Sequence, residues 1–160
     1  MSEEKKNIGI RIQEIKELSY SNKLFDELVE NFDEERVDIK LGFAVRGDSN
    51  KNTISLSIII HYKYTSENDN KPKEFLKLET DTTFKVFDFT DEDIKYSNEN
   101  HEIFINDDLM AIFLNTAIGS TRGMLAYKIA SLPINIVLPL FDINEILNPK
   151  QNIKEGKVKK

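Results

Sequence analysis

The chain has 160 residues, 39% hydrophobic and 31% charged, which predicts one compact domain and excludes a large multidomain enzyme. Its 28 acidic and 22 basic side chains give a formal charge of -6, which argues against a generally basic surface for nucleic acid. Cysteine is absent, so disulfides, thiolate metal sites and cysteine nucleophiles are excluded.

Neither end of the chain nor its longest apolar stretch predicts a membrane protein. Residues 1–7 have no apolar core of a secretory signal, so we expect a cytoplasmic protein. The apolar stretch 109–129 is interrupted by polar side chains that include Arg122 and Lys128. These are too many for an ordinary span, so we expect a soluble protein without membrane insertion.

The first half of the chain alternates apolar and polar residues with a period of two, which is typical of strands with one buried face. Three strands are predicted, over residues 37–45, 54–64 and 76–86, with a turn at Gly47-Asp48-Ser49-Asn50 that joins the first two as an antiparallel hairpin. Upstream, Ile8, Ile10 and Ile12 begin the same pattern before it changes phase at Ile15. That change predicts a bulge.

Between the upstream segment that ends near Ile15 and the strand predicted over residues 37–45, apolar residues recur at i, i+1, i+4, i+5 and i+8. They are Leu24, Phe25, Leu28, Val29 and Phe32. The spacing fits either a short helix or a crossover packed on the sheet, and the sequence does not separate the two.

From Asp107 to about Ile129 the pattern becomes helical and apolar almost all round. One side carries Leu109, Ile112 and Phe113. A helix with two apolar faces needs two partners, and in a small domain the second is most simply another subunit. The residues expected at that subunit interface are Met110, Leu114, Ala117, Ile118, Thr121 and Arg122.

Arg122 is the one charged residue within the apolar part of this helix, so its guanidinium must find a carboxylate, a group of carbonyls or water. We favour a structural ion pair, within one chain or between subunits, over a catalytic role. The motif Gly119-Ser120-Thr121-Arg122-Gly123 lies inside the helical pattern and not between a strand and a helix. It therefore predicts tight helix packing and not a phosphate cradle.

After the helix, Pro133 and Pro139 bracket an extended apolar segment over residues 132–141, and Asp142 is placed to cap a short final helix. Beyond Pro149 the chain is polar, with five lysines against one glutamate. We therefore expect a domain over residues 1–149 and a disordered basic tail over residues 150–160.

Catalytic and metal-binding patterns are weak. His61 and His101 have no serine and acid beside them in a nucleophilic arrangement, and the carboxylate clusters lack the spacing of a calcium loop. We expect ordinary surface histidines, no metal, no cofactor and no enzymatic activity. A rival hypothesis, a small-ligand-binding or hydrolytic β-domain, predicts a polar pocket around one of the two histidines.

The amount of apolar surface is unusual, because the crossover and the segment after the long helix carry more of it than the strands alone can cover. Two interpretations stay open: these side chains form a groove for apolar peptide, or they complete the core. The groove candidates are Leu24, Phe25, Leu28, Val29, Phe32, Ile134, Ile136, Leu138, Leu140, Phe141 and Ile146.

The order of these elements, over residues 8–148, resembles the SecB family of export chaperones. The likeness is carried by Ile12-Gln13-Glu14-Ile15, by Leu18-Ser19-Tyr20, by Thr121-Arg122-Gly123-Met124-Leu125 with Leu132-Pro133, and by residues 136–147. The resemblance implies an α+β fold, a four-stranded antiparallel sheet with a long helix and a short C-terminal helix on one side. It also implies a homotetramer, a dimer of dimers with the long helices between the sheets.

The same resemblance implies an ATP-independent holdase that binds non-native polypeptides in apolar grooves. Members of the family pass export precursors to the translocation motor or, in a SecB-like branch, guard the antitoxin of a toxin-antitoxin pair. Of the acidic residues that meet the motor, Glu17 matches one, whereas Ser21 falls where another would be and the tail is basic. Motor docking therefore departs from the family pattern, and the client is left open.

Overall fold

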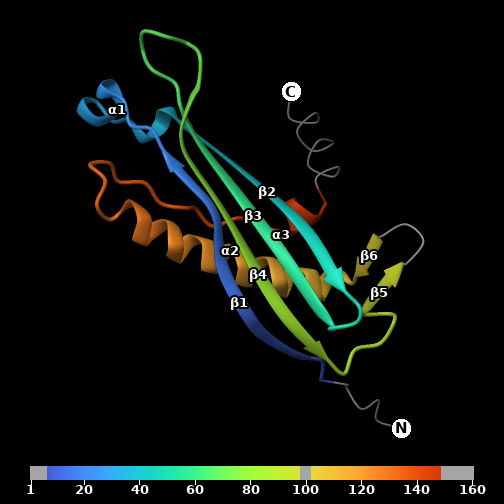
Figure 1. Ribbon diagram of the computed structural model, residues 1–160. Helices are drawn as coiled ribbons and strands as arrows, with labels where there is room; N and C mark the ends of the chain where they lie inside the picture. The colour runs from blue at the N-terminus through green and yellow to red at the C-terminus, as the bar shows by residue number, and fades with distance from the viewer. Residues whose placement is uncertain (1–6, 98–101, 149–160) are drawn as a thin grey trace, which may run out of the picture.

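The computed structural model describes residues 7–97 and 102–148, so the expected basic tail and His101 lie outside it. Its main sheet has four long antiparallel strands in the order β1-β4-β3-β2 (Figure 1). They are β1 (Gly9–Asn22), β2 (Val37–Asp48), β3 (Thr53–Tyr64) and β4 (Lys73–Phe87). The long helix α2 (Asp107–Ile129) and the short helix α3 (Ile143–Leu147) complete the predicted α+β fold, which is confirmed.

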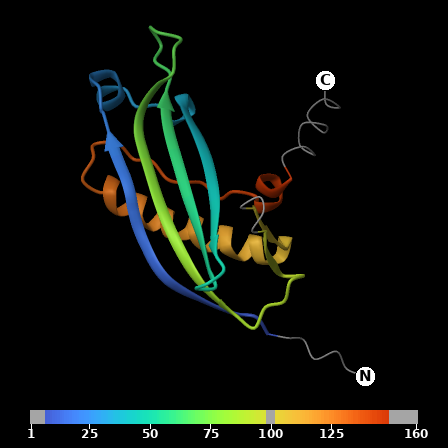
Figure 2. The ribbon, with the colours of Figure 1, turned by 45° about the vertical axis from the view of Figure 1, so that its right-hand side comes forward.

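One face of the sheet, called here the inner face, carries α2 and the segment that follows it (Figures 1 and 2). The alternating pattern of β3 and β4 directs the apolar side chains to this face, where they are buried. On β3 they are Ile54, Leu56, Ile58, Ile60, Tyr62 and Tyr64. The opposite, outer face is polar. At its centre the buried carboxylate of Asp81 accepts hydrogen bonds from Ser57 and Arg46, both at 2.9 Å.

The hairpin of β2 and β3 continues beyond the predicted turn. Gly47 and Asp48 still pair with Ile54 and Thr53, so the turn occupies residues 49–52 and not 47–50. The Asp48 carboxylate accepts from the backbone of Asn50 at 3.0 Å, which is the local bond expected of an aspartate at a turn. Asn52 takes a positive φ of 51°, as asparagine tolerates.

The predicted irregularity in the first strand is present. β1 shifts register against β4 between Ile12 and Glu14, and a second time between Glu17 and Ser19. The crossover, residues 23–36, contains both features that its spacing allowed, because α1 (Asp26–Glu30) and the 3-10 helix η1 (Glu34–Arg36) lie within a segment packed on the sheet.

A small hairpin that the sequence did not predict lies between β4 and α2. It consists of β5 (Ile94–Ser97) and β6 (Glu102–Ile105), two strands of four residues each. The hairpin packs against the end of β2, where Gly47 touches Ile103 and Tyr96 so closely that a Cβ atom would clash with both. Glycine is therefore required at this position by the close approach.

α2 begins where the pattern predicted. Asn106 caps it by accepting from the backbone of Leu109 at 2.8 Å. Over the middle of the sheet, Thr80 and Thr121 are both fully buried and their hydroxyls lie 2.7 Å apart. Because the Thr121 hydroxyl donates to the carbonyl of Ala117, Thr80 donates to Thr121. α3 is capped by Asp142, as predicted. No described helix is long and apolar enough to cross a membrane.

The buried hydroxyl of Thr82 has no hydrogen-bond partner among the described residues, although it stands two positions from the paired Thr80. Thr82→Val keeps the shape and removes the unpaired group, so it should raise the free energy of unfolding by about 1 kcal/mol, whereas Thr80→Val should lower it by a similar amount. Urea denaturation of the two variants measures this. Equal effects would mean that the two hydroxyls have equivalent surroundings.

Candidate functional site

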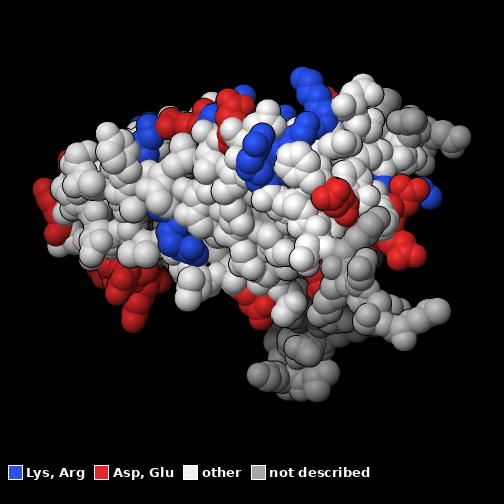
Figure 3. All heavy atoms as spheres, turned by 90° about the horizontal axis from the view of Figure 1, so that it is seen from below, with Lys and Arg blue, Asp and Glu red and all other residues white. Residues whose placement is uncertain are grey.

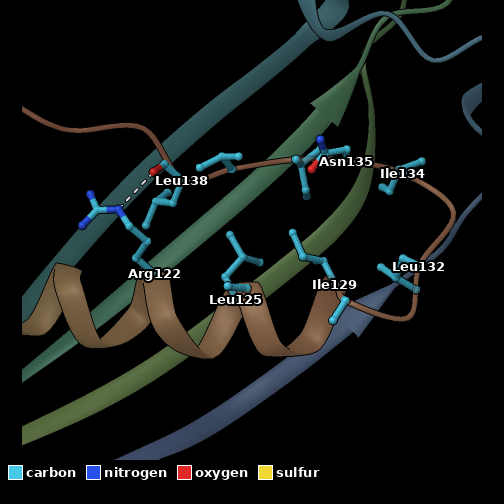
Figure 4. Close-up of a pocket in the computed structure, with 11 residues that line it drawn as sticks. Arg122, Leu125, Ile129, Leu132, Ile134, Asn135 and Leu138 are labelled. Atoms are coloured by element: carbon cyan, nitrogen blue, oxygen red, sulfur yellow. Dashed lines mark hydrogen bonds between the residues drawn. The ribbon is translucent and has the colours of Figure 1, made fainter.

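The segment between α2 and α3, residues 132–141 and called here the strap, runs across the inner face beside α2 without forming a helix or a strand (Figures 1 and 4). Its side chains alternate. Ile134, Ile136 and Leu138 are buried, and Val137 between them is 67% exposed. The alternation is that of an extended chain with one face on the core.

Side chains from the core supply the hydrogen bonds that the strap does not obtain from a sheet. Arg122 donates from Nε to the carbonyl of Leu138 at 3.1 Å and from Nη2 to that of Pro139 at 2.9 Å (Figure 4). The hydroxyl of Tyr62 on β3 donates to the carbonyl of Val137 at 3.2 Å. Three consecutive carbonyls are thus held by two side chains.

These contacts decide what Arg122 does. Of the three partners that the sequence allowed, the guanidinium takes carbonyls of its own chain, and no ion pair of Arg122 is found among the described residues. An ion pair between subunits stays a prediction. A planar guanidinium suits this role, because its donors point in fixed directions and reach two neighbouring acceptors.

The crossover is fixed by the tyrosine two positions further along β3. The hydroxyl of Tyr64 donates to the carbonyl of Asn31 at 3.1 Å and accepts from the backbone of Asp33 at 3.3 Å. The rings of Phe25 and Phe32 pack against the Tyr64 ring, with centroids 6.0 and 6.1 Å away. Both irregular segments of the inner face are therefore attached to β3.

Two cavities flank the strap and share Asn135, Ile136 and Val137 as their common wall. The first, the helix-side cavity, has a volume of about 340 Å³ and lies between the strap and α2, where Leu125 and Ile129 point toward it (Figure 4). The second, the edge-side cavity, has a volume of about 320 Å³ and lies between the strap and the start of β2. It is lined by Phe32, Val37, Ile39, Tyr62 and Pro139, with Glu34 and Glu35.

The predicted groove residues divide into three groups by burial. Leu28, Ile134, Ile136 and Leu138 are buried in the core, Leu24, Phe25, Phe32, Phe141 and Ile146 are half-buried against it, and Val29 and Leu140 are exposed. Leu140 is 90% exposed. The core interpretation holds for the four buried residues, and the groove and client contact stay predictions for the others.

Several lining residues were missed by the sequence, among them Val37, Ile39 and Tyr62. Their alternation identified them as inner-face residues of strands, but nothing local shows that they border a cavity beside the strap. The prediction for His61 as a surface residue is consistent with the structure, since it lies on the outer face with Nδ1 2.8 Å from Glu74. It lines neither cavity beside the strap.

No protein-family model matches the chain, and no curated protein matches it significantly. Among solved structures, the SecB-like chaperone Rv1957 of Mycobacterium tuberculosis, in complex with a ChAD peptide from the antitoxin HigA1 (Rv1956), superposes with a TM-score of 0.51 at 13% identity. The match covers 83% of this chain and 91% of that one. The fold is SecB-like. A Streptococcus agalactiae protein of unknown function also matches, at 10% identity over 84% of this chain and 99% of that one, but its TM-score of 0.28 supports no argument.

Within this SecB-like fold, the residues predicted at the subunit interface are mostly turned inward. Leu114, Ala117, Ile118 and Thr121 are buried against the sheet of their own protomer, which corrects that assignment, because a side chain in the core is not free to meet a second subunit. Met110 is half-buried and Arg122 is bound to the strap.

The face of α2 that does point outward is made of other residues. Ile112 is 48% and Tyr127 82% exposed, and a Cβ atom added to Gly119 or Gly123 would meet open space. Apart from Arg122, α2 carries no charged side chain between Asp108 and Lys128. The tight packing predicted for the two glycines is therefore not found within the protomer.

Glu17 is not the free acidic group that motor docking was expected to use. The first register shift of β1, between Ile12 and Glu14, puts it on the inner side, opposite Thr80, where its carboxylate lies 2.7 Å from Nζ of Lys128 on α2. The same Nζ lies 4.9 Å from the centre of the Tyr20 ring. Lys128 therefore ties the edge strand to the helix.

Burial raises the pKa of the Tyr62 hydroxyl from 10.0 to about 12, against a smaller opposing effect of the nearby Arg122. The unfolded chain then loses this proton first, so the stability that neutral Tyr62 contributes is complete below pH 10 and falls by about 1.4 kcal/mol per pH unit between the two values. Denaturation in that range should show a shallower decline for Tyr62→Phe. The matched change Tyr127→Phe, at an exposed position, should leave the decline as it is.

Proposed function

We propose that this protein is an ATP-independent chaperone, a holdase that binds apolar segments of non-native polypeptides along the strap. The observation that carries the proposal is the pair of apolar-lined cavities on the two sides of the strap, with exposed Val137 and Leu140 on the strap itself. An unfolded client loses entropy when it is bound, so a holdase needs many modest apolar contacts spread along an extended surface. Two shallow cavities in a line supply that arrangement better than one deep pocket.

The SecB-like fold supports this class of function and favours one kind of client. The Mycobacterium neighbour is a chaperone bound to an antitoxin peptide, which supports a dedicated antitoxin chaperone more than a general export chaperone. The pairing of Glu17 with Lys128 points the same way, because it removes one of the acidic groups with which export members meet the translocation motor. We therefore propose an antitoxin as the client, and keep export precursors as the alternative.

The proposal predicts that the chain suppresses aggregation of a chemically unfolded model protein and that ATP does not change the suppression. Val137→Ser with Leu140→Ser should weaken client binding about tenfold or more, since each change removes an exposed apolar side chain worth about 1 to 2 kcal/mol when covered. Light scattering of the aggregating client and fluorescence titration measure the two effects.

The matched control is Phe104→Ser, which removes an exposed apolar side chain of β6, away from the strap. It should leave client binding unchanged. All three positions are exposed, so thermal melting should be unaffected in both proteins. A strap variant that binds clients as well as the control variant does would contradict the proposal.

We propose further that the protein is a homotetramer, a dimer of dimers in which the outward face of α2 meets a second copy. Figure 3, a view of one face of the molecule, shows a wide area without charged side chains. On α2 itself Ile112 and Tyr127 are exposed, and exposed apolar surface marks an interaction site in soluble proteins when it forms a contiguous patch. Gly119 and Gly123 leave the backbone of α2 open to a close approach by another helix.

Light scattering coupled to size exclusion should therefore give four times the mass of one chain. Gly119→Leu with Gly123→Leu raises helix propensity, and the added Cβ atoms have no atom of their own protomer within 4 Å, so an isolated protomer should become more stable. In an assembly packed through this face, the same change should dissociate the subunits. Lys95→Ala on β5 serves as the control. A monomeric wild-type protein at micromolar concentration would refute the assembly.

A further inference from the structure

β2 forms one edge of the main sheet (Figure 2). It pairs with β3 along one side, and within residues 7–97 and 102–148 no strand pairs with its other side. The β5–β6 hairpin lies beside the last part of β2, at Val45, Arg46 and Gly47, but no backbone hydrogen bond joins it to β2 among the described residues. The backbone from Val37 to Val45 therefore presents a free edge.

The register shows which backbone groups of β2 point to that edge. The backbone of Thr65 donates to the carbonyl of Arg36 at 3.1 Å, so Arg36 and Thr65 form a hydrogen-bonded pair just before the strand. Such pairs alternate along an antiparallel ladder. Lys40, Gly42 and Ala44 therefore bond to β3. The residues whose N–H and C=O groups point outward are Ile39, Leu41, Phe43 and Val45.

These outward groups make no other backbone or side-chain hydrogen bond with the described part of the chain. The edge also lacks two of the features that usually prevent pairing with another chain, a proline and a bulge. β2 contains no proline and pairs with β3 over all 12 residues without a register shift, whereas β1 has two shifts. A long regular edge of this kind is a template for a further strand.

The side chains of the same residues point to the inner face and are apolar. Ile39, Leu41 and Val45 are half-buried, Phe43 is 36% exposed, and Ile39 lines the edge-side cavity. In an antiparallel pair, residues that exchange hydrogen bonds have side chains on the same face. A strand added at this edge would place every second side chain beside these apolar groups.

Charge distinguishes the two ends of the edge. At the start of β2, Glu34 and Glu35 line the edge-side cavity and Asp38 is exposed. Arg36, the cation among them, lies 3.6 Å from the carboxylate of Asp33 and 3.2 Å from that of Glu67. This end favours a basic segment.

We propose that the free edge of β2 binds an extended segment of the client as an additional antiparallel strand. The segment has apolar residues at every second position, which face the strap, and basic residues at its C-terminal end, beside Glu34 and Glu35. The proposal rests on the holdase function and adds a main-chain component to it, so that recognition depends on backbone and pattern more than on one sequence.

The test uses a synthetic peptide of 12 residues, the length of β2, in which valine and leucine alternate with serine and threonine and two lysines stand at the C-terminus. In hydrogen exchange followed by NMR, the amides of Ile39, Leu41, Phe43 and Val45 should exchange fast in the free protein and slowly in the complex. Those of Lys40, Gly42 and Ala44 should be slow throughout.

Two N-methylated forms of the peptide separate backbone pairing from side-chain contact. Methylating the apolar residues removes the N–H groups that point at β2, so affinity should fall about tenfold or more, whereas methylating the polar residues should leave it nearly unchanged. Replacing the lysines by glutamates should also weaken binding. Equal affinity of the two methylated peptides would overturn the proposal.

Two further outcomes would overturn it as well. If the four outward amides are already protected in the free protein, a second copy or another part of the chain occupies the edge. If they stay fast at saturating peptide while the protein still suppresses aggregation, clients bind elsewhere and only the edge pairing is wrong. Loss of aggregation suppression itself would instead contradict the holdase function.

Discussion

Two tyrosine hydroxyls on β3 hold in place the parts of this molecule that are neither helix nor sheet. Tyr62 bonds to the strap and Tyr64 bonds to the crossover, and both rings are buried in the core. An irregular segment has no neighbouring strand to form hydrogen bonds with its backbone N–H and C=O groups. Each such group that is buried without a partner costs about 1 to 3 kcal/mol of stability. Because they extend from the most buried strand, the two rings place these contacts on the most rigid part of the fold.

Arg122 complements this arrangement from the opposite side. It reaches the strap from α2, so the strap is held between a strand and a helix that are themselves packed together. The cavities on its two sides exist because a single extended chain, and not a second helix, covers this part of the sheet. The strap is one extended chain held by a few hydrogen bonds, so apolar surface stays accessible beside it while the core stays covered. This suits a protein that must bind apolar segments and remain folded.

The elements of the fold were predictable because their signals are local. Alternation identified the long strands and the phase change at Ile15 identified a bulge, while Asp107 and Asp142 marked the starts of two helices. The β5–β6 hairpin was missed because each of its strands has four residues, too few for a period to be recognised among acidic neighbours.

The orientation of α2 was predicted less well, because an almost uniformly apolar helix gives no internal signal of which face meets the sheet. The exposed face carries Gly119, Gly123 and a few uncharged polar side chains such as Asn115, but it also carries Ile112 and Tyr127, so the difference in polarity from the buried face is small. The carbonyl partners of Arg122 were not singled out for a different reason. Every residue has a backbone carbonyl, so the sequence does not show which carbonyls lie near Arg122. Those of Leu138 and Pro139 come close to it only in the folded chain.

The buried pair of Thr80 and Thr121 has a consequence for the geometry of the strap. Aliphatic side chains on a helix and a sheet pack almost equally well in neighbouring positions, so a purely apolar contact would let α2 slide or rotate by a fraction of a turn. The directional hydrogen bond between the two hydroxyls, within an otherwise apolar layer, selects a single position of α2 on the sheet. Arg122 follows Thr121 directly in the chain, so the position of α2 also determines where Arg122 holds the strap. The widths of the helix-side and edge-side cavities therefore depend on the hydrogen bond between Thr80 and Thr121.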